Sequence, residues 1–280
     1  MIVCKSPAEI DRMRGANEVV AAVLTDLAGA IAPGVTTGEL DERAEALIRA
    51  AGATPAFKGY HGYPAALCVS INDEVIHGIP SPTRRLAEGD IVSVDVGAVL
   101  DGFVGDSAVT FPVGAVPERA AMLMRVTQEA LYRAILAVKV GGRVSDIGDA
   151  VQRHVEAHGC SVVREFVGHG IGTAMHEEPQ VPNYGPPGRG ARLTEGMVVA
   201  IEPMVNLGRP AVRVLDDGWT AVTRDRSLSA HFEHTVAVAE EGPFVLTARG
   251  DERFDEVLAS AGLAAPDGVE ARWRKRTRLK

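Results

Sequence analysis

The sequence predicts an α+β fold in which one unit of helices and strands is used twice. Helix-patterned and strand-patterned segments occur in both halves of the 280-residue chain. Residues 38–52 and 145–159 also align at an offset of 107, and each segment ends at a glycine after an acidic-apolar start. Such a repeat indicates an internal duplication, with halves at about residues 1–115 and 116–250.

The first half begins with two predicted helices. Ser6 and Pro7 form a helix-start signal, and apolar residues then recur at helical spacing until Pro33. We therefore expect helices over residues 6–31 and 37–51. Strands are expected over residues 67–71, 90–96 and 103–111, and the turn at Asp101-Gly102 predicts that the last two form an antiparallel hairpin.

The second half repeats this order. Helices are expected over residues 117–138 and 145–158, with His154 and His158 at the surface of the second one. Strands are expected at residues 197–202, near 211–215 and at 235–239. Residues 1–250 are predicted to form a single domain, and residues 251–280 a C-terminal extension.

Composition places the chain among cytoplasmic proteins that do not enter membranes. Hydrophobic residues make up 46% and charged residues 24% of the sequence, as in ordinary globular domains. No apolar run approaches the ~20 residues that span a bilayer, and the N-terminus has no signal-peptide pattern. The three cysteines are widely spaced without a C-x-x-C, which is typical of reduced thiols.

The charge distribution is asymmetric. The formal net charge of −8 argues against broad nucleic-acid binding. Residues 272–280 nevertheless contain six basic residues, which leaves about −14 on the rest of the chain. This basic tail predicts either contact with an anionic partner or a solvated terminus.

Two aspartates occupy the predicted hairpin. Asp95 lies in an apolar run, where a buried carboxylate needs a cation, a metal or a proton. Asp106 follows eleven residues later on the partner strand. The hairpin could place both carboxylates on one face, although one could equally be a cap and the other a strand-end residue.

Three further candidates come from the second half. His169 lies between glycines in a G-x-G-x-G run, whose spacing is not that of a dinucleotide fingerprint. Glu202 closes an apolar strand, and Glu233 precedes another. Four carboxylates and one imidazole suit Mn²⁺, Fe²⁺ or Co²⁺ and tolerate Zn²⁺. Two such ions would give a two-metal hydrolase that activates a bridging hydroxide.

A series of short motifs lies along the chain at residues 59–64 (GYHGYP), 70–72 (SIN), 77–80 (HGIP), 94–96 (VDV), 101–103 (DGF), 105–106 (GD), 168–172 (GHGIG), 176–181 (HEEPQV), 201–204 (IEPM), 217–219 (DGW), 227–229 (SLS) and 233–235 (EHT). In these motifs and their order, the chain resembles the type I methionine aminopeptidases of bacteria over residues 1 to about 249. The resemblance implies a pita-bread (creatinase/aminopeptidase) fold, with pseudo-twofold halves, antiparallel sheet and outer helices. It also implies a monomer that removes the initiator methionine from nascent proteins when the second residue is small.

The resemblance also assigns residues to roles. It implies two divalent ions held by Asp95, Asp106, His169, Glu202 and Glu233, with a metal-bridging hydroxide that attacks the scissile carbonyl. Glu202 would also transfer protons, and His77 and His176 would hydrogen-bond the substrate. A methionine pocket would use Phe57, Tyr60, Tyr63, Cys68, Met175 and Trp219, and a monovalent cation would bind near Asn72 and Ser229.

Two alternatives remain at this stage. A proline-selective peptidase of the same fold, such as a prolidase, usually carries a large additional N-terminal domain that 280 residues cannot hold. A non-catalytic binding protein of the same fold would have lost its metal ligands, whereas all five are present here.

Overall fold

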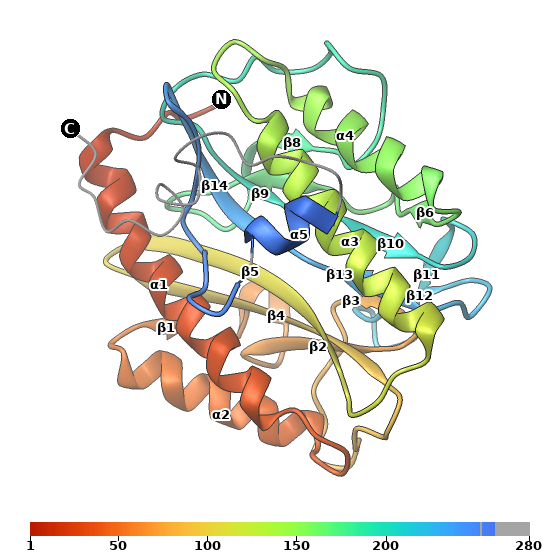
Figure 1. The fold of residues 1–280 in the computed structure, drawn as a ribbon. Helices are drawn as coiled ribbons and strands as arrows, with labels where there is room; N and C mark the ends of the chain where they lie inside the picture. The colour runs from red at the N-terminus through yellow and green to blue at the C-terminus, as the bar shows by residue number, and fades with distance from the viewer. Residues whose placement is uncertain (253, 261–280) are drawn as a thin grey trace.

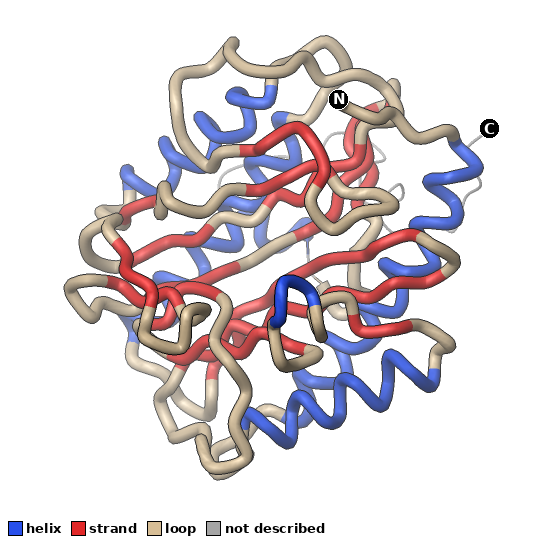
Figure 2. Tube along the Cα trace, turned by 180° about the vertical axis from the view of Figure 1, so that it is seen from behind, coloured by secondary structure: helices blue, strands red, loops and turns tan. Residues whose placement is uncertain are grey.

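The computed structural model describes residues 1–252 and 254–260. Helices cover one side of the molecule and strands lie on the other (Figures 1 and 2). The helices are α1 (Pro7–Ala30), α2 (Thr37–Ala50), η1 (Tyr60–Gly62), α3 (Glu118–Ala137), α4 (Val144–Ala157) and α5 (Phe254–Ser260). The predicted basic tail at residues 272–280 lies outside the described residues.

The strands form four sheets. Strands of the first half are β1 (Thr54–Pro55), β2 (Leu67–Ile71), β3 (Glu74–Ile76), β4 (Ile91–Leu100) and β5 (Phe103–Pro112). Those of the second half are β6 (Ser161–Val162), β7 (Gly168–Gly170), β8 (Glu177–Val181), β9 (Val198–Ile201), β10 (Met204–Asn206), β11 (Val212–Val214), β12 (Ala221–Thr223), β13 (Ser229–His231), β14 (His234–Ala239) and β15 (Gly242–Val245).

Local signals in the sequence explain where the helices begin. Ser6 and Glu9 form a capping box at α1, and Thr36 and Glu39 form the same motif at α2, which satisfies backbone N–H groups that have no partner within the helix. The helices α2 and α4, which carry the repeated segments, contain 14 residues each. The helices predicted from the sequence are therefore present with boundaries shifted by only one or two residues.

Two antiparallel sheets bring the halves together. In the first half, the sheet runs β1-β4-β2 with β5 paired to β4; in the second half, it runs β15-β14-β9-β7-β8. Strands β5 and β14 meet where Glu233 N donates to Ala108 O at 2.8 Å and Ser107 Oγ donates to Glu233 O at 2.6 Å. This seam carries one acidic residue from each half, Asp106 and Glu233.

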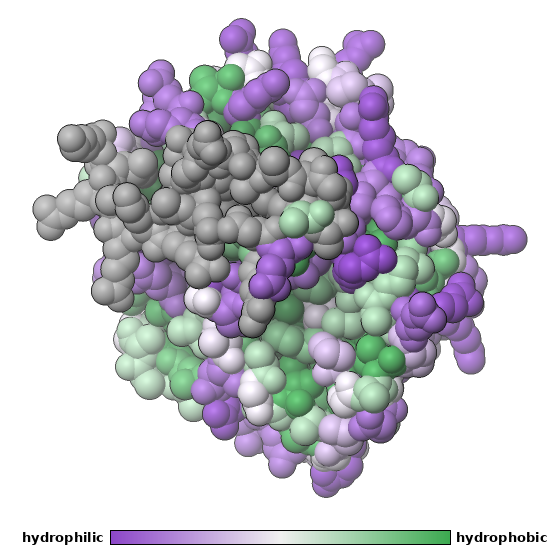
Figure 3. Space-filling view, in the orientation of Figure 1, coloured by the Kyte–Doolittle hydropathy of each residue, from purple (hydrophilic) through white to green (hydrophobic). Residues whose placement is uncertain are grey.

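The hydrophobic core lies between the helices and the sheets. Leu24 and Leu27 of α1, and Leu123 and Ile135 of α3, are fully buried in one cluster that draws on both halves. The helix-covered face mixes hydrophilic and hydrophobic side chains (Figure 3). Within the described residues, no helix combines the length and apolar character that a membrane span requires.

Candidate metal centre

The five predicted ligands extend from strand positions in both halves. Asp95 is on β4 and Asp106 on β5, and the hairpin pairs Gly97 with Asp106 and Asp95 with Ala108. Because this register makes the two aspartates diagonal neighbours, their side chains share one face of the sheet. His169 is on β7, while Glu202 follows β9 and Glu233 precedes β14.

These side chains converge on one cavity of about 260 Å³, which all five line. Asp106, His169 and Glu233 each offer a ligand atom within 4.8 Å of the others. His169 Nε2 lies 3.4 Å from Glu202 Oε1 and 3.9 Å from Asp106 Oδ2. The structure thus brings together the residues that the sequence analysis selected.

The carboxylates of this cluster lack the partners that buried charges need. Asp95 Oδ1, Asp106 Oδ1 and Glu233 Oε1 are buried without a hydrogen-bond partner among the described residues. Burial raises the pKa of Asp95 to about 7. Burial first, and then repulsion by neighbouring carboxylates, raises the pKa values of Asp106, Glu202 and Glu233 well above their usual range. A divalent cation would relieve both costs, so this donor set fits a metal.

Glycines beside His169 let three strands approach closely. A Cβ at Gly168 would lie 2.3 Å from Ala200 O, and one at Gly170 would lie 2.3 Å from Glu178 O. Any side chain there would collide with the backbone of β9 or β8. The glycine-rich run around His169 therefore allows the backbone to approach closely.

His77 and His176 both line the cavity. Burial, reinforced by His176, lowers the pKa of His77 to about 4, and burial also lowers the pKa of His176. Both imidazoles are therefore neutral at pH 7. His176 Nδ1 is 2.8 Å from the Tyr60 hydroxyl, which fixes the orientation of the ring.

The apolar side of the cavity contains all six residues predicted for the side-chain pocket: Phe57, Tyr60, Tyr63, Cys68, Met175 and Trp219. The Tyr63 hydroxyl donates to the carbonyl oxygens of Leu67 at 2.9 Å and Gly78 at 3.0 Å, and its ring packs edge-on against Trp219. A Cβ at Gly97 would lie 2.7 Å from the Phe57 ring. The glycine therefore makes room for this large side chain.

Sequence reasoning missed several residues around the site. Phe166 lines the cavity and packs edge-on against His77. Its position three residues before His169 in the sequence could have indicated that it lies near the site. His231 was given no role, yet it is 2% exposed and its Nε2 lies 3.9 Å from Glu202 Oε2. Burial lowers the pKa of His231 to about 3, so it is a neutral neighbour of Glu202.

Asn72 and Ser229 lie next to each other, and Ser229 N donates to Asn72 O at 2.8 Å. Asn72 adopts a positive φ of 56°. The Ser229 hydroxyl donates to the side-chain oxygen of Asn206 at 2.8 Å. The monovalent cation expected near these residues stays a prediction.

Comparison with known proteins identifies the family. Residues 11–240 match the sequence model of metallopeptidase family M24. The chain belongs to this family. It is 52% identical over 247 residues to the methionine aminopeptidase of Clostridium acetobutylicum, covering 88% of this chain and 99% of that one. The crystal structure of methionine aminopeptidase from Thermotoga maritima superposes with a TM-score of 0.88 at 48% identity, covering 89% of this chain and 100% of that chain.

Membership of family M24 confirms the pita-bread fold and the resemblance to bacterial methionine aminopeptidases. The fold extends to the prolidase from Pyrococcus horikoshii, with a TM-score of 0.72 at 24% identity. That match covers 90% of this chain and only 65% of the prolidase. As in other metallopeptidases, the cofactors are divalent metal ions, and the buried group of Asp106, His169 and Glu233 is a candidate site for them.

Proposed function

We propose that this member of family M24 is a methionine aminopeptidase, a hydrolase that removes the N-terminal methionine of nascent proteins when the next residue is small. The observation that carries this function is a carboxylate cluster in a cavity that also has aromatic and sulfur-containing lining residues. Three buried oxygens of the cluster, on Asp95, Asp106 and Glu233, have no hydrogen-bond partner among the described residues. Relatives named methionine aminopeptidases support it.

Asp95, Asp106, His169, Glu202 and Glu233 would hold two divalent ions. Four carboxylates balance the charge of two such ions, and the oxygen-rich set suits Mn²⁺, Fe²⁺ or Co²⁺ and tolerates Zn²⁺. When bound, the ions supply Lewis acidity that polarises the scissile carbonyl. A monovalent cation near Asn72 and Ser229 is part of this proposal.

Glu202 is the residue best suited to move protons. It is 9% exposed, and its two oxygens face His169 and His231. Burial, and then the Asp95 carboxylate, raise its pKa, and a carboxylate held at the site can accept and release a proton during catalysis. It would take a proton from the attacking water and pass it to the departing amine.

His77 and His176 would bind the scissile amide as neutral hydrogen-bonding groups. Because the Tyr60 hydroxyl engages His176 Nδ1, the other ring nitrogen is left for the substrate. A donor placed there stabilises negative charge as it develops on the carbonyl oxygen. His77 would contact the amide nitrogen.

The apolar wall would hold the methionine side chain. Tyr63, Cys68 and Trp219 belong to one apolar cluster, Tyr60 and Met175 belong to another, and Phe57 packs against both. A flexible thioether gains from such soft and aromatic contacts. These contacts would give the enzyme its preference for methionine.

Peptide cleavage tests this function. Purified protein with added Mn²⁺ or Co²⁺ should release methionine from Met-Gly-Met-Ser, while an Xaa-Pro peptide should remain intact. Asp106→Asn should reduce turnover at least ~10³-fold, because it replaces a charged metal ligand with a neutral amide. Absence of methionine release with every divalent ion, or preferential cleavage of the Xaa-Pro peptide, would refute the proposal.

The basic segment at residues 272–280 would bring a monomeric enzyme to ribosomal RNA in the cytoplasm. Deletion of this segment should weaken co-sedimentation with ribosomes at low salt and leave Met-Gly-Met-Ser turnover unchanged, because phosphate contacts are lost without disturbing the cavity. Equal co-sedimentation of the full and truncated chains would exclude this role for the tail.

A further inference from the structure

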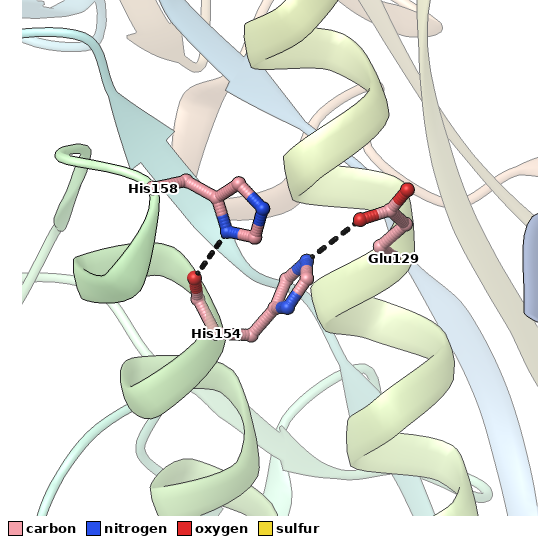
Figure 4. A group of neighbouring side chains, drawn as sticks. All are labelled: Glu129, His154 and His158. Atoms are coloured by element: carbon pink, nitrogen blue, oxygen red, sulfur yellow. Dashed lines mark hydrogen bonds and ion pairs between the residues drawn. The ribbon is translucent and has the colours of Figure 1, made fainter. Parts of the chain in front are cut away.

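A second group of metal-binding side chains lies between helices α3 and α4, away from the cavity described above. Glu129 extends from α3, and His154 and His158 lie one turn apart at the end of α4 (Figure 4). One ligand atom of each residue lies within 4.8 Å of the other two. Both histidines are expected at the surface from the sequence, but His154 is only 8% exposed because it packs against Glu129.

His158 is oriented as a ligand. Its Nδ1 lies 2.8 Å from His154 O, and a ring nitrogen that bonds a carbonyl oxygen must carry the proton. The lone pair of His158 is therefore on Nε2. Histidines that bind metals are held in this way, with the second nitrogen donating to a carbonyl or carboxylate.

The two carboxylate oxygens of Glu129 contact different residues. Arg125 Nη1 donates to Oε1 at 3.0 Å, and His154 Nε2 lies 2.9 Å from Oε2. Neighbouring ligand atoms around a tetrahedral Zn²⁺ are about 3.3 Å apart. An ion could thus replace the proton shared by His154 and Glu129 if these two atoms moved apart by a few tenths of an ångström and the His158 ring nitrogen, now within 4.8 Å of both, moved closer.

The charges around Glu129, His154 and His158 are compatible with a bound cation. Burial lowers the pKa of His154, with further contributions from Arg133 and His158, and neutral imidazole is the form that binds metals at pH 7. The Glu129 carboxylate and the carbonyl end of α4 offset the nearby guanidinium groups. A surface hollow lined by His154, Arg133 and Arg153 gives solvent access.

We propose that Glu129, His154 and His158 form a second divalent-metal site, outside the catalytic cavity, that takes an ion such as Zn²⁺ and links α3 to α4. Two imidazoles and one carboxylate favour Zn²⁺, Ni²⁺ or Cu²⁺ over Mn²⁺. Water would complete the coordination. Since binding requires the folded helix pair, the ion would stabilise the second half of the molecule.

Zinc binding is measured in a chain whose catalytic cavity is disabled by Asp106→Asn and Glu233→Gln. Equilibrium dialysis against Zn²⁺ should retain one ion per chain, and the Tm should rise by a few degrees. Adding His158→Ala should weaken binding at least tenfold and abolish the Tm rise. Adding Glu156→Ala, which removes an exposed carboxylate of the same helix, should preserve both.

His158 is exposed, so its replacement should leave the Tm without zinc unchanged, and this measurement verifies that the variant is folded. The proposal is overturned if the disabled chain retains no zinc, or if His158→Ala binds zinc as well as Glu156→Ala does. Because these measurements use metal content and melting, their outcome is independent of peptide cleavage.

Discussion

Glu202 lies between two histidines of different character. His169, 3.4 Å away, belongs to the proposed ligand set, whereas His231, 3.9 Å away, approaches the other carboxylate oxygen from β13. His231 Nε2 is buried without a hydrogen-bond partner among the described residues. At 3.9 Å this nitrogen makes no direct hydrogen bond to Glu202, but a small approach of the carboxylate would let a neutral N–H restrain its orientation. We therefore expect His231 to act as a positioning residue.

This role can be tested by replacing His231. His231→Leu should lower kcat about tenfold with little change in KM, because the donor beside Glu202 is lost while the methionine pocket is intact. His231→Gln keeps a side-chain N–H and should restore most of the activity. Steady-state kinetics with Met-Gly-Met-Ser provides the measurement, and equal activity of the Leu and Gln variants would contradict the assignment.

At the scale of elements, the segment after β15 is clamped to the active-site strand. His234, at the start of β14, lies with Nε2 2.9 Å from Glu252 Oε1 and Nδ1 2.9 Å from Thr247 Oγ1. Arg249 Nη2 is 3.0 Å from the same Glu252 oxygen. Since His234 directly follows Glu233, these contacts fix the strand end that carries a proposed metal ligand.

Acid should weaken the contacts of Glu252 with His234 and Arg249. Although burial opposes ionisation, the charges of His234 and Arg249 and their hydrogen bonds lower the pKa of Glu252 from 4.5 to about 2. A lowered pKa stabilises the fold fully above about pH 4.5, and this contribution is lost as the pH falls from there towards 2.

Glu252→Gln should therefore cost about 3 kcal/mol at pH 7 and flatten the pH dependence of stability in this range. Urea unfolding at pH 7 and at pH 3 measures both effects. A variant that loses as much stability as the wild type between these pH values would show that Glu252 does not carry the acid sensitivity.

At the scale of the whole molecule, the helices and the β4–β5 hairpin were predictable because their signals are local. Capping boxes, helical periodicity and the Asp101-Gly102 turn each act within a few residues. Short strands such as β7 and β10 escaped prediction, because three residues carry no periodicity and are held by distant partners.

Local sequence patterns could not predict that the five proposed metal ligands come together. Asp95 and Asp106 could be paired from one hairpin, but strand spacing alone could not bring Glu202 and Glu233 to them. Family motifs supplied that expectation. His231 escaped both approaches because its approach to Glu202 depends on how β13 packs beside β10. The buried state of His154 likewise depends on Glu129, 25 residues away.

Anomalous diffraction from a crystal soaked in Mn²⁺ tests the metal centre most directly. We expect Mn²⁺ peaks enclosed by Asp95, Asp106, His169, Glu202 and Glu233, and their loss in Asp106→Asn crystals. An active, manganese-soaked enzyme with no anomalous peak among these five side chains would contradict the assignment of the metal centre.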